Sequence, residues 1–149
     1  MDNELRCILK ARNSNIKIAR NIAQIFFAQL DSSIGFLNEI KTIVSEGITN
    51  AIVHGYDNNE LMDVYLNLSY DSNFIYIEII DKGIGILDIE LAKTPMFTTK
   101  GDEDRSGLGF TIIDVFSDEM IIESSMGNGT KLKVIKRIVN FPEKEVLTD

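Results

Sequence analysis

The sequence has too few cysteines and too few basic residues for several classes of protein. One cysteine occurs in 149 residues, so no disulfide can form within the chain. Lysine and arginine number 15 against 23 aspartates and glutamates, which gives a formal net charge of −8. Non-specific binding to nucleic acid or to an anionic membrane needs an excess of cations, so we expect neither partner.

The sequence also lacks an apolar run long enough to cross a bilayer or to form the core of a signal peptide. We therefore expect a cytoplasmic protein. Internal repeats and low-complexity tracts are absent as well. With 44% hydrophobic residues, the chain is long enough for one domain with a substantial core and too short for two. We expect a single domain over residues 1–139 and a flexible tail over residues 140–149.

Hydrophobic periodicity predicts a chain in which helices and strands alternate in groups. Alternating apolar residues predict strands at residues 4–11, 64–68, 75–79, 120–126 and 130–137. Apolar residues at helical spacing predict helices over residues 18–30, from residue 34 to Gly55, and over residues 107–116. Between residues 86 and 106 the apolar pattern weakens, which predicts a mobile loop of functional length.

Glu46, Asn50 and His54 are spaced four residues apart, so they form one row on the second predicted helix. The opposite side of this helix is apolar, which puts the row at the edge of a groove. There Glu46 could supply a base and Asn50 a magnesium ligand. On spacing alone, a plain solvated stripe is the favoured alternative. His54 directly precedes Gly55, so it can instead bond the last carbonyls of the helix.

Asp81 falls on the same strand face as the isoleucines at alternate positions 75–79. A buried carboxylate is costly unless donors surround it, so Asp81 needs a partner. An exocyclic amine such as that of adenine would serve, as would backbone N–H groups of the following turn. Gly83 and Gly85 allow that turn to bend sharply, although an Asp-x-Gly-x-Gly string is often only a turn. Thr130 also points inward, either to the same ligand or to backbone.

Gly107, Leu108 and Gly109 open the last predicted helix, where backbone N–H groups and the helix dipole favour an anion. A phosphate is the natural occupant of such a position. Lys100 and Arg105 could neutralise it. The alternative is a flexible glycine hinge with solvated charges.

Taken together, these motifs resemble those of the GHKL superfamily of ATP-binding domains. The matching elements are Glu46-x3-Asn50, Asp81-Lys-Gly83-Ile-Gly85, Gly107-Leu-Gly109 and Gly129-Thr130. Within the superfamily, residues 43–56, 97–100 and 105–112 are similar to the anti-sigma-F factors of sporulating bacteria. The resemblance spans roughly residues 3–136. It implies an α/β fold, a two-layer sandwich in which helices cover one face of a mixed β-sheet and ATP binds between the layers.

The resemblance also assigns roles to the motif residues. It implies that Asn50 binds Mg2+, that Asp81 accepts a hydrogen bond from the adenine amine, and that Thr130 supports this contact. Glu46 would act as a general base. The remaining nucleotide-binding positions are glycines of the two loops and a lid over the phosphates. These positions are Gly83, Gly85, Thr98, Thr99, Lys100, Arg105, Gly107, Leu108 and Gly109.

Finally, the resemblance implies a function. Such a factor binds and silences a sigma-F type sigma factor, and it uses Mg-ATP to phosphorylate a serine of an anti-anti-sigma partner protein. The helix that bears Arg20 would belong to the partner-binding surface, and the protein would be a homodimer. One alternative is an ATP-gated binding module without kinase activity. Another, the catalytic domain of a sensor histidine kinase, is not expected, because no dimerisation segment with a phospho-accepting histidine precedes the motifs.

Overall fold

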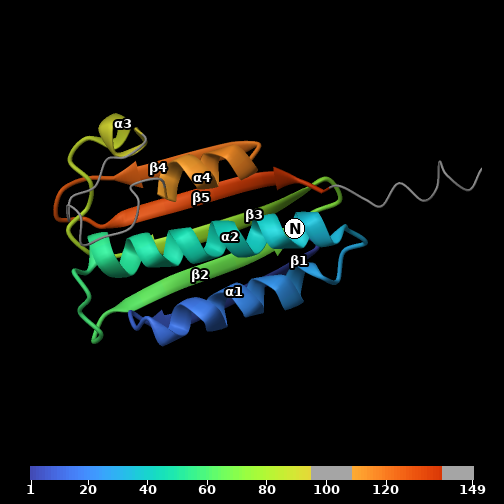
Figure 1. Cartoon of the computed structure of the whole chain (residues 1–149), viewed down its shortest axis with the longest axis horizontal. Helices are drawn as coiled ribbons and strands as arrows, with labels where there is room; N and C mark the ends of the chain where they lie inside the picture. Colours follow the sequence, from blue (N-terminus) through green and yellow to red (C-terminus); the bar gives the residue numbers. More distant parts are fainter. Residues whose placement is uncertain (95–108, 139–149) are drawn as a thin grey trace, which may run out of the picture.

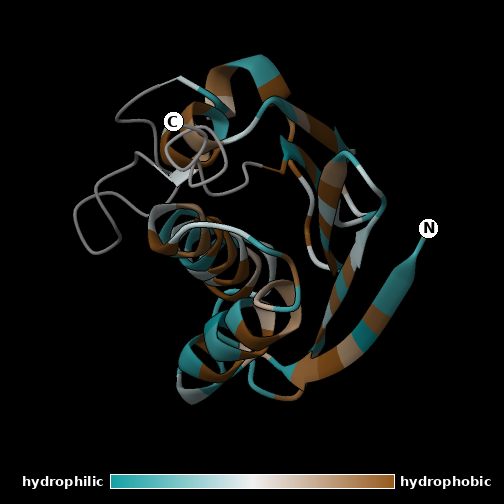
Figure 2. Cartoon of the chain, turned by 90° about the vertical axis from the view of Figure 1, so that its right-hand side faces the viewer, coloured by the Kyte–Doolittle hydropathy of each residue, from teal (hydrophilic) through white to brown (hydrophobic). Residues whose placement is uncertain are grey.

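In the computed structural model, which describes residues 1–94 and 109–138, helices lie on one face of a five-stranded sheet (Figure 1). The strands, in spatial order, are β1 (Asn3–Lys10), β2 (Asp63–Tyr70), β3 (Phe74–Asp81), β5 (Thr130–Arg137) and β4 (Glu119–Ser124). The helices of the described ranges are α1 (Ser14–Phe27), α2 (Ile34–Asn50), the π-helix η1 (Ala51–Gly55), α3 (Ile89–Ala92) and α4 (Gly109–Phe116). Figure 2 shows the sheet from its edge, with the helices on one side of it. The predicted two-layer α/β fold is confirmed.

Neighbouring strands of the described sheet all run antiparallel. β1 and β2 are adjacent although two helices, α1 and α2, connect them. A single helix between two adjacent strands would make the second strand run parallel to the first. Two successive helices reverse the chain direction once more, so β2 runs antiparallel to β1. β3 and β4 run parallel, but β5 lies between them. The mixed sheet implied by the family resemblance therefore has no adjacent parallel pair over the described strands.

The predicted alternation of apolar residues is confirmed in the two central strands, where every second side chain is buried. These side chains are Val64, Leu66, Leu68, Ile75, Ile77 and Ile79. The helix α2 packs over them with buried residues of its own, which are Phe36, Ile40, Ile43, Val44 and Ile48. Full burial of an aliphatic side chain of this size contributes about 1.5–3 kcal/mol. This core holds the helix layer on the sheet.

The two long helices lie close to their predicted positions. The first, predicted over residues 18–30, spans Ser14–Phe27. The second begins after Ser33, whose Oγ accepts a hydrogen bond from the Phe36 N–H at 3.1 Å. Such a cap satisfies one of the free N–H groups at a helix start. The predicted end at Gly55 is correct, but the last five residues form the π-helix η1.

The loop predicted from residue 86 is wrong at its beginning, because α3 forms there. Asp88 caps this helix by accepting a hydrogen bond from the Leu91 N–H at 3.0 Å. A helix of four residues is too short to leave a helical period in the sequence, which explains why the pattern did not predict it. Residues 95–106 of the predicted loop and the predicted tail, residues 140–149, lie outside the described residues.

The end of η1 packs directly against the loop that follows β3. The Gly55 carbonyl oxygen accepts a hydrogen bond from the Ile84 N–H at 3.0 Å. A Cβ added to Gly83 would lie 1.9 Å from the Gly55 oxygen, and one added to Gly55 would lie 2.7 Å from the Asp81 carboxyl carbon. Only glycine fits at either position. This contact brings the helix layer and the loop after β3 together at one end of the molecule.

We predict that Gly83→Ala destabilises the protein, because its Cβ would overlap a backbone oxygen that cannot rotate away. The expected loss is about 1–3 kcal/mol of unfolding free energy, the usual cost of overpacking. Chemical denaturation followed by circular dichroism would measure it. Gly35→Ala is the matched control, since a Cβ there meets only the Ser33 Oγ at 3.9 Å. Equal stability of the Gly83→Ala variant and the wild type would contradict the close contact.

Candidate functional site

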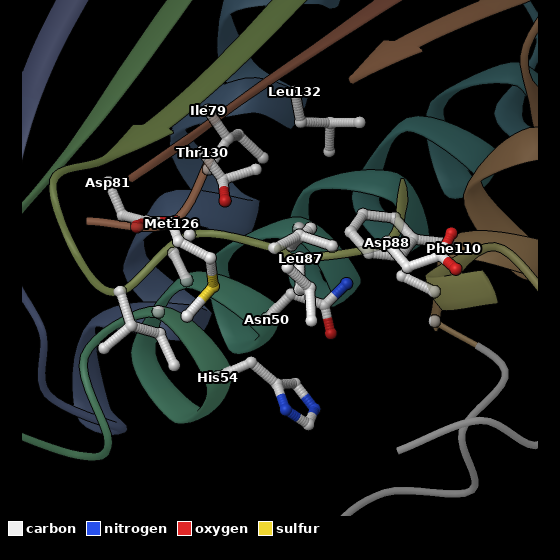
Figure 3. Close-up of a pocket in the computed structure, with 18 of the residues that line it drawn as sticks. Asn50, His54, Ile79, Asp81, Leu87, Asp88, Phe110, Met126, Thr130 and Leu132 are labelled. Atoms are coloured by element: carbon white, nitrogen blue, oxygen red, sulfur yellow. The ribbon is translucent and has the colours of Figure 1, made fainter. Parts of the chain in front are cut away.

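A cavity of about 350 Å³ opens between the helix layer and the end of the sheet (Figure 3). Its size suits a small-molecule ligand. The walls come from α2, η1, the ends of β3 and β5, the segment from Ile84 to Ala92, and the start of α4. The polar side chains that line it are Asn50, His54, Asp81, Asp88 and Thr130. Three of these five, Asn50, Asp81 and Thr130, were predicted as site residues, and His54 was predicted to lie in one row with Glu46 and Asn50.

Asp81 lies on the apolar face of β3, as predicted, and is only 5% exposed. Its Oδ1 accepts a hydrogen bond from the Gly83 N–H at 2.9 Å, so the following turn supplies one of its partners. Burial raises the pKa of Asp81 to about 6, although hydrogen bonds from the backbone of Gly83 and Thr130 act in the opposite direction. The carboxylate also lines the cavity. Both partners considered from the sequence are therefore compatible with its position.

Asn50 and Glu46 lie beside the first residue of α4. A Cβ on Gly109 would lie 3.1 Å from both polar atoms of the Asn50 amide and 3.3 Å from the Glu46 Oε1. Glycine at this position thus allows α4 to begin against the Glu46 and Asn50 row. The Asn50 Nδ2 is buried and finds no hydrogen-bond partner among the described residues. Such an unsatisfied buried donor is rare in folded proteins, and a hydrogen-bond acceptor from a ligand would satisfy it.

His54, the last residue of the row, also lines the cavity. His54 belongs to η1 and lines the cavity together with Asn50 (Figure 3). His54 thus lines the cavity from the last turn of η1, a position that is compatible with both roles that the sequence left open for it. Glu46 is not among the lining residues, so it faces the start of α4 rather than the cavity itself.

The glycines of the second motif have different roles. Gly85 lines the cavity and has a positive φ of 80°, a conformation that other residues adopt with strain. Gly83 is not among the lining residues. Its N–H donates a hydrogen bond to Asp81, and its lack of a side chain leaves room for the Gly55 carbonyl oxygen. Thr130 lies directly opposite Asp81 across the β3–β5 pairing and lines the cavity.

Several of the predicted residues cannot be placed in the site. Six of them lie outside the described residues, and these are Thr98, Thr99, Lys100, Arg105, Gly107 and Leu108. Arg20 is described and lies on α1, but it does not line the cavity. Its Nε is buried and has no hydrogen-bond partner in residues 1–94 and 109–138.

An apolar rim surrounds the cavity, and the sequence did not predict it. Its members are large hydrophobic residues that line the cavity and are nonetheless exposed, namely Ile84, Leu87, Leu91 and Met126. Exposed apolar groups clustered at a concave surface are typical of a ligand site. The sequence feature that could have indicated this rim is a group of apolar residues between residues 84 and 91 that follows neither helical nor strand spacing.

No helix in the described ranges is long and apolar enough to span a membrane.

Comparison with known proteins assigns the fold to an ATPase domain family. Residues 9–136 match the family model of the histidine kinase-like ATPase domain. Among solved structures, part of the structure of the RsbU and RsbW domains of a Mycobacterium tuberculosis protein has a similar fold, with a TM-score of 0.64 and 16% identity. That match covers 93% of this chain and 34% of the other.

Curated relatives are much closer in sequence. The anti-sigma F factor of Bacillus subtilis is 43% identical over 138 residues, which covers 93% of this chain and 94% of the relative. The anti-sigma F factor of Geobacillus stearothermophilus is 42% identical over 147 residues, 99% of each chain. The chain therefore belongs to the histidine kinase-like ATPase domain family and, within it, to the family of the anti-sigma F factors.

Proposed function

We propose that this chain is an anti-sigma factor that is also a serine-protein kinase using Mg-ATP. It would bind and inhibit a sigma-F type sigma factor, and it would phosphorylate a serine of an anti-anti-sigma partner. One observation carries the proposal: the same cavity is lined by the buried acceptor Asp81 at the end of β3 and by Asn50 at the end of α2, whose Nδ2 has no hydrogen-bond partner among the described residues and whose amide lies close to Glu46. The name of the relatives supports the choice of the sigma factor.

The surroundings of Asp81 support adenine as the base. An ionised carboxylate only accepts hydrogen bonds, so it pairs with an exocyclic amine and repels a carbonyl at the same place. The Gly83 N–H holds the carboxylate in a fixed orientation. Ile79, Met126 and Leu132 line the same part of the cavity, which gives the apolar walls that the faces of a purine require (Figure 3).

The surroundings of Asn50 support a shared magnesium and phosphate site. No group of three or more His, Cys, Asp or Glu in the described residues could hold a metal alone. Mg2+ does not require such a group, because it keeps several waters and binds one or two protein oxygens together with substrate phosphates. The Asn50 amide fits the role of that single oxygen ligand. When bound, the ion would neutralise negative charge on the phosphates during transfer.

Glu46 is the candidate for the general base. Its Oε1 faces the first residue of α4, where backbone N–H groups and the helix dipole favour phosphate. The partner's serine hydroxyl would lose its proton to this carboxylate while its oxygen bonds to the γ-phosphorus. The bond from that phosphorus to the bridging oxygen would break, and ADP would leave. Lys100 and Arg105, which lie outside the described residues, would offset charge on the transferring group.

Arg20 supports a partner surface on α1. Its buried Nε lacks a hydrogen-bond partner among the described residues, and leaving such a donor unsatisfied is costly. The residue as a whole is only partly buried, so a carboxylate of a bound protein could pair with the exposed part of the guanidinium. We also propose that the chain acts as a homodimer and in the cytoplasm, where a sigma factor would meet it.

A second candidate function is an ATP-gated binding module that sequesters its partner without phosphorylating it. The observation in its favour is that Glu46 is not among the residues that line the cavity. Measurement of phosphoryl transfer separates the two candidates, because both bind nucleotide.

We predict that Asp81→Asn weakens ADP binding at least tenfold, because the amide turns a donor toward the adenine amine. The loss of a charged hydrogen bond and the unpaired donor together justify this size. Isothermal titration calorimetry would measure the dissociation constant. The matched control is Asp114→Asn, on an exposed part of α4 away from the cavity lining. Unchanged affinity in Asp81→Asn would contradict the proposed orientation of the base.

The raised pKa of Asp81 predicts opposite effects of acid on stability and on binding. The pKa of Asp81 in the folded protein, about 6, exceeds the ordinary value of 3.8 for an aspartate. Between these two pH values the folded protein therefore binds a proton more readily than the unfolded chain does. Asp81 therefore adds stability to the free protein as pH falls from about 6 to 4. Over the same range it loses its charge, so ADP affinity should fall. Both trends are measured relative to Asp81→Asn, and their persistence in that variant would exclude Asp81 as the source.

We predict that Glu46→Gln lowers the rate of phosphoryl transfer about 10²–10⁴-fold, the usual contribution of a general base, while ADP affinity changes little. The assay combines labelled ATP, Mg2+ and a candidate anti-anti-sigma protein and detects acid-stable phosphoserine. A normal rate in Glu46→Gln would exclude Glu46 as the base. Nucleotide binding by the wild type without any phosphoserine would favour the binding module.

A further inference from the structure

Ser124, the last residue of β4, lies behind the cavity in one row with two residues that line it. Across the sheet, Asp81 pairs with Thr130 and Thr130 pairs with Ser124. Residues directly opposite one another on neighbouring strands point to the same face. The row therefore runs along the helix-covered side of the sheet. Asp81 and Thr130 line the cavity, whereas Ser124 does not.

The Ser124 hydroxyl has three polar neighbours. Its Oγ accepts a hydrogen bond from the Ile86 N–H at 2.8 Å and donates one to the Gly129 carbonyl oxygen at 2.8 Å. The Thr130 Oγ1 lies 2.9 Å from the same atom. The hydroxyl thus joins the loop after β3 to the start of β5.

A count of protons fixes the direction of the third contact. A serine hydroxyl has one proton and two lone pairs. Because a carbonyl oxygen can only accept, the Ser124 proton is used on Gly129. The contact between the two hydroxyls is then a hydrogen bond only if Thr130 donates. Thr130 consequently presents lone pairs, and no proton, to the cavity.

We propose that Ser124 is a positioning residue that sets the specificity for the nucleobase by holding Thr130 as a hydrogen-bond acceptor. Thr130 and Asp81 are then two acceptors side by side in the sheet register. They match an exocyclic amine, which has two N–H donors, and they oppose a carbonyl at the same position of the ring. This inference rests on the proposed nucleotide site and adds to it how adenine is selected over a 6-oxopurine.

A purely structural role for Ser124 predicts a different outcome. If the hydroxyl only stabilised the turn before β5, its loss would weaken all nucleotides to the same extent. If it acts through Thr130, its loss frees the Thr130 hydroxyl to rotate and donate to a carbonyl. The ratio of the dissociation constants for inosine diphosphate and ADP separates these cases, because general loosening of the site cancels from it.

The experiment measures this ratio by calorimetry for the wild type and for variants of the whole chain. Ser124→Ala should lower the ratio about fivefold, the value of one ordinary hydrogen bond. Ser124→Thr keeps the hydroxyl and should keep the ratio. Ser125→Ala is the matched control, since it removes the neighbouring hydroxyl, which accepts from Asn128 Nδ2 at 2.8 Å and does not contact Thr130 in the described network.

A double-mutant cycle completes the test. If Ser124 acts through Thr130, then Ser124→Ala combined with Thr130→Val should give the same ratio as Thr130→Val alone. Additive effects, or an unchanged ratio in Ser124→Ala, would overturn the inference while leaving the nucleotide site intact. A wild type that binds neither nucleotide would overturn the site and the inference with it. If Ser124→Ala does not fold, Ser124→Cys, a weak donor of similar size, provides the same comparison.

Discussion

The site depends on one backbone contact, the hydrogen bond from the Ile84 N–H to the Gly55 carbonyl oxygen at 3.0 Å. It joins the end of the helix layer to the loop that leaves β3. Gly55 and Gly83 leave no space for a side chain at this point, so the two backbones meet directly. Asp81 and Asn50 belong to different layers, and this contact determines how far apart they lie. A change there would alter both ends of the cavity together.

The same contact gives Asp81 its chemical character. Because η1 covers the carboxylate, burial raises its pKa to about 6 and leaves the ionised form in need of donors. The protein itself supplies donors from the backbone of Gly83 and Thr130. An amine from a ligand would supply another, so binding would relieve part of the penalty of burial. Perturbed carboxylates of this kind concentrate at functional sites.

The sequence predicted the features that local periodicity controls. The period of two in β3 placed Asp81 on the apolar face, and the four-residue spacing placed Asn50 and His54 in one row. The meeting of this row with Gly109 depends on how β4, β5 and α4 pack, so only the family resemblance suggested it. Ser124 could not be found from the sequence, because a single hydroxyl at the end of a strand has no periodic signal. The antiparallel pairing of β1 with β2 follows from the number of helices between them, a property of the topology rather than of any motif.

The central claim is that one cavity binds Mg-ADP with its base at Asp81 and its phosphates toward Asn50. A crystal structure of the chain with Mg-ADP would test it most directly. We expect the adenine amine within about 3 Å of the Asp81 carboxylate, the usual hydrogen-bond distance, and the metal coordinated by the Asn50 amide oxygen. A nucleotide bound outside the cavity, or inside it with the base turned away from Asp81, would exclude this binding mode.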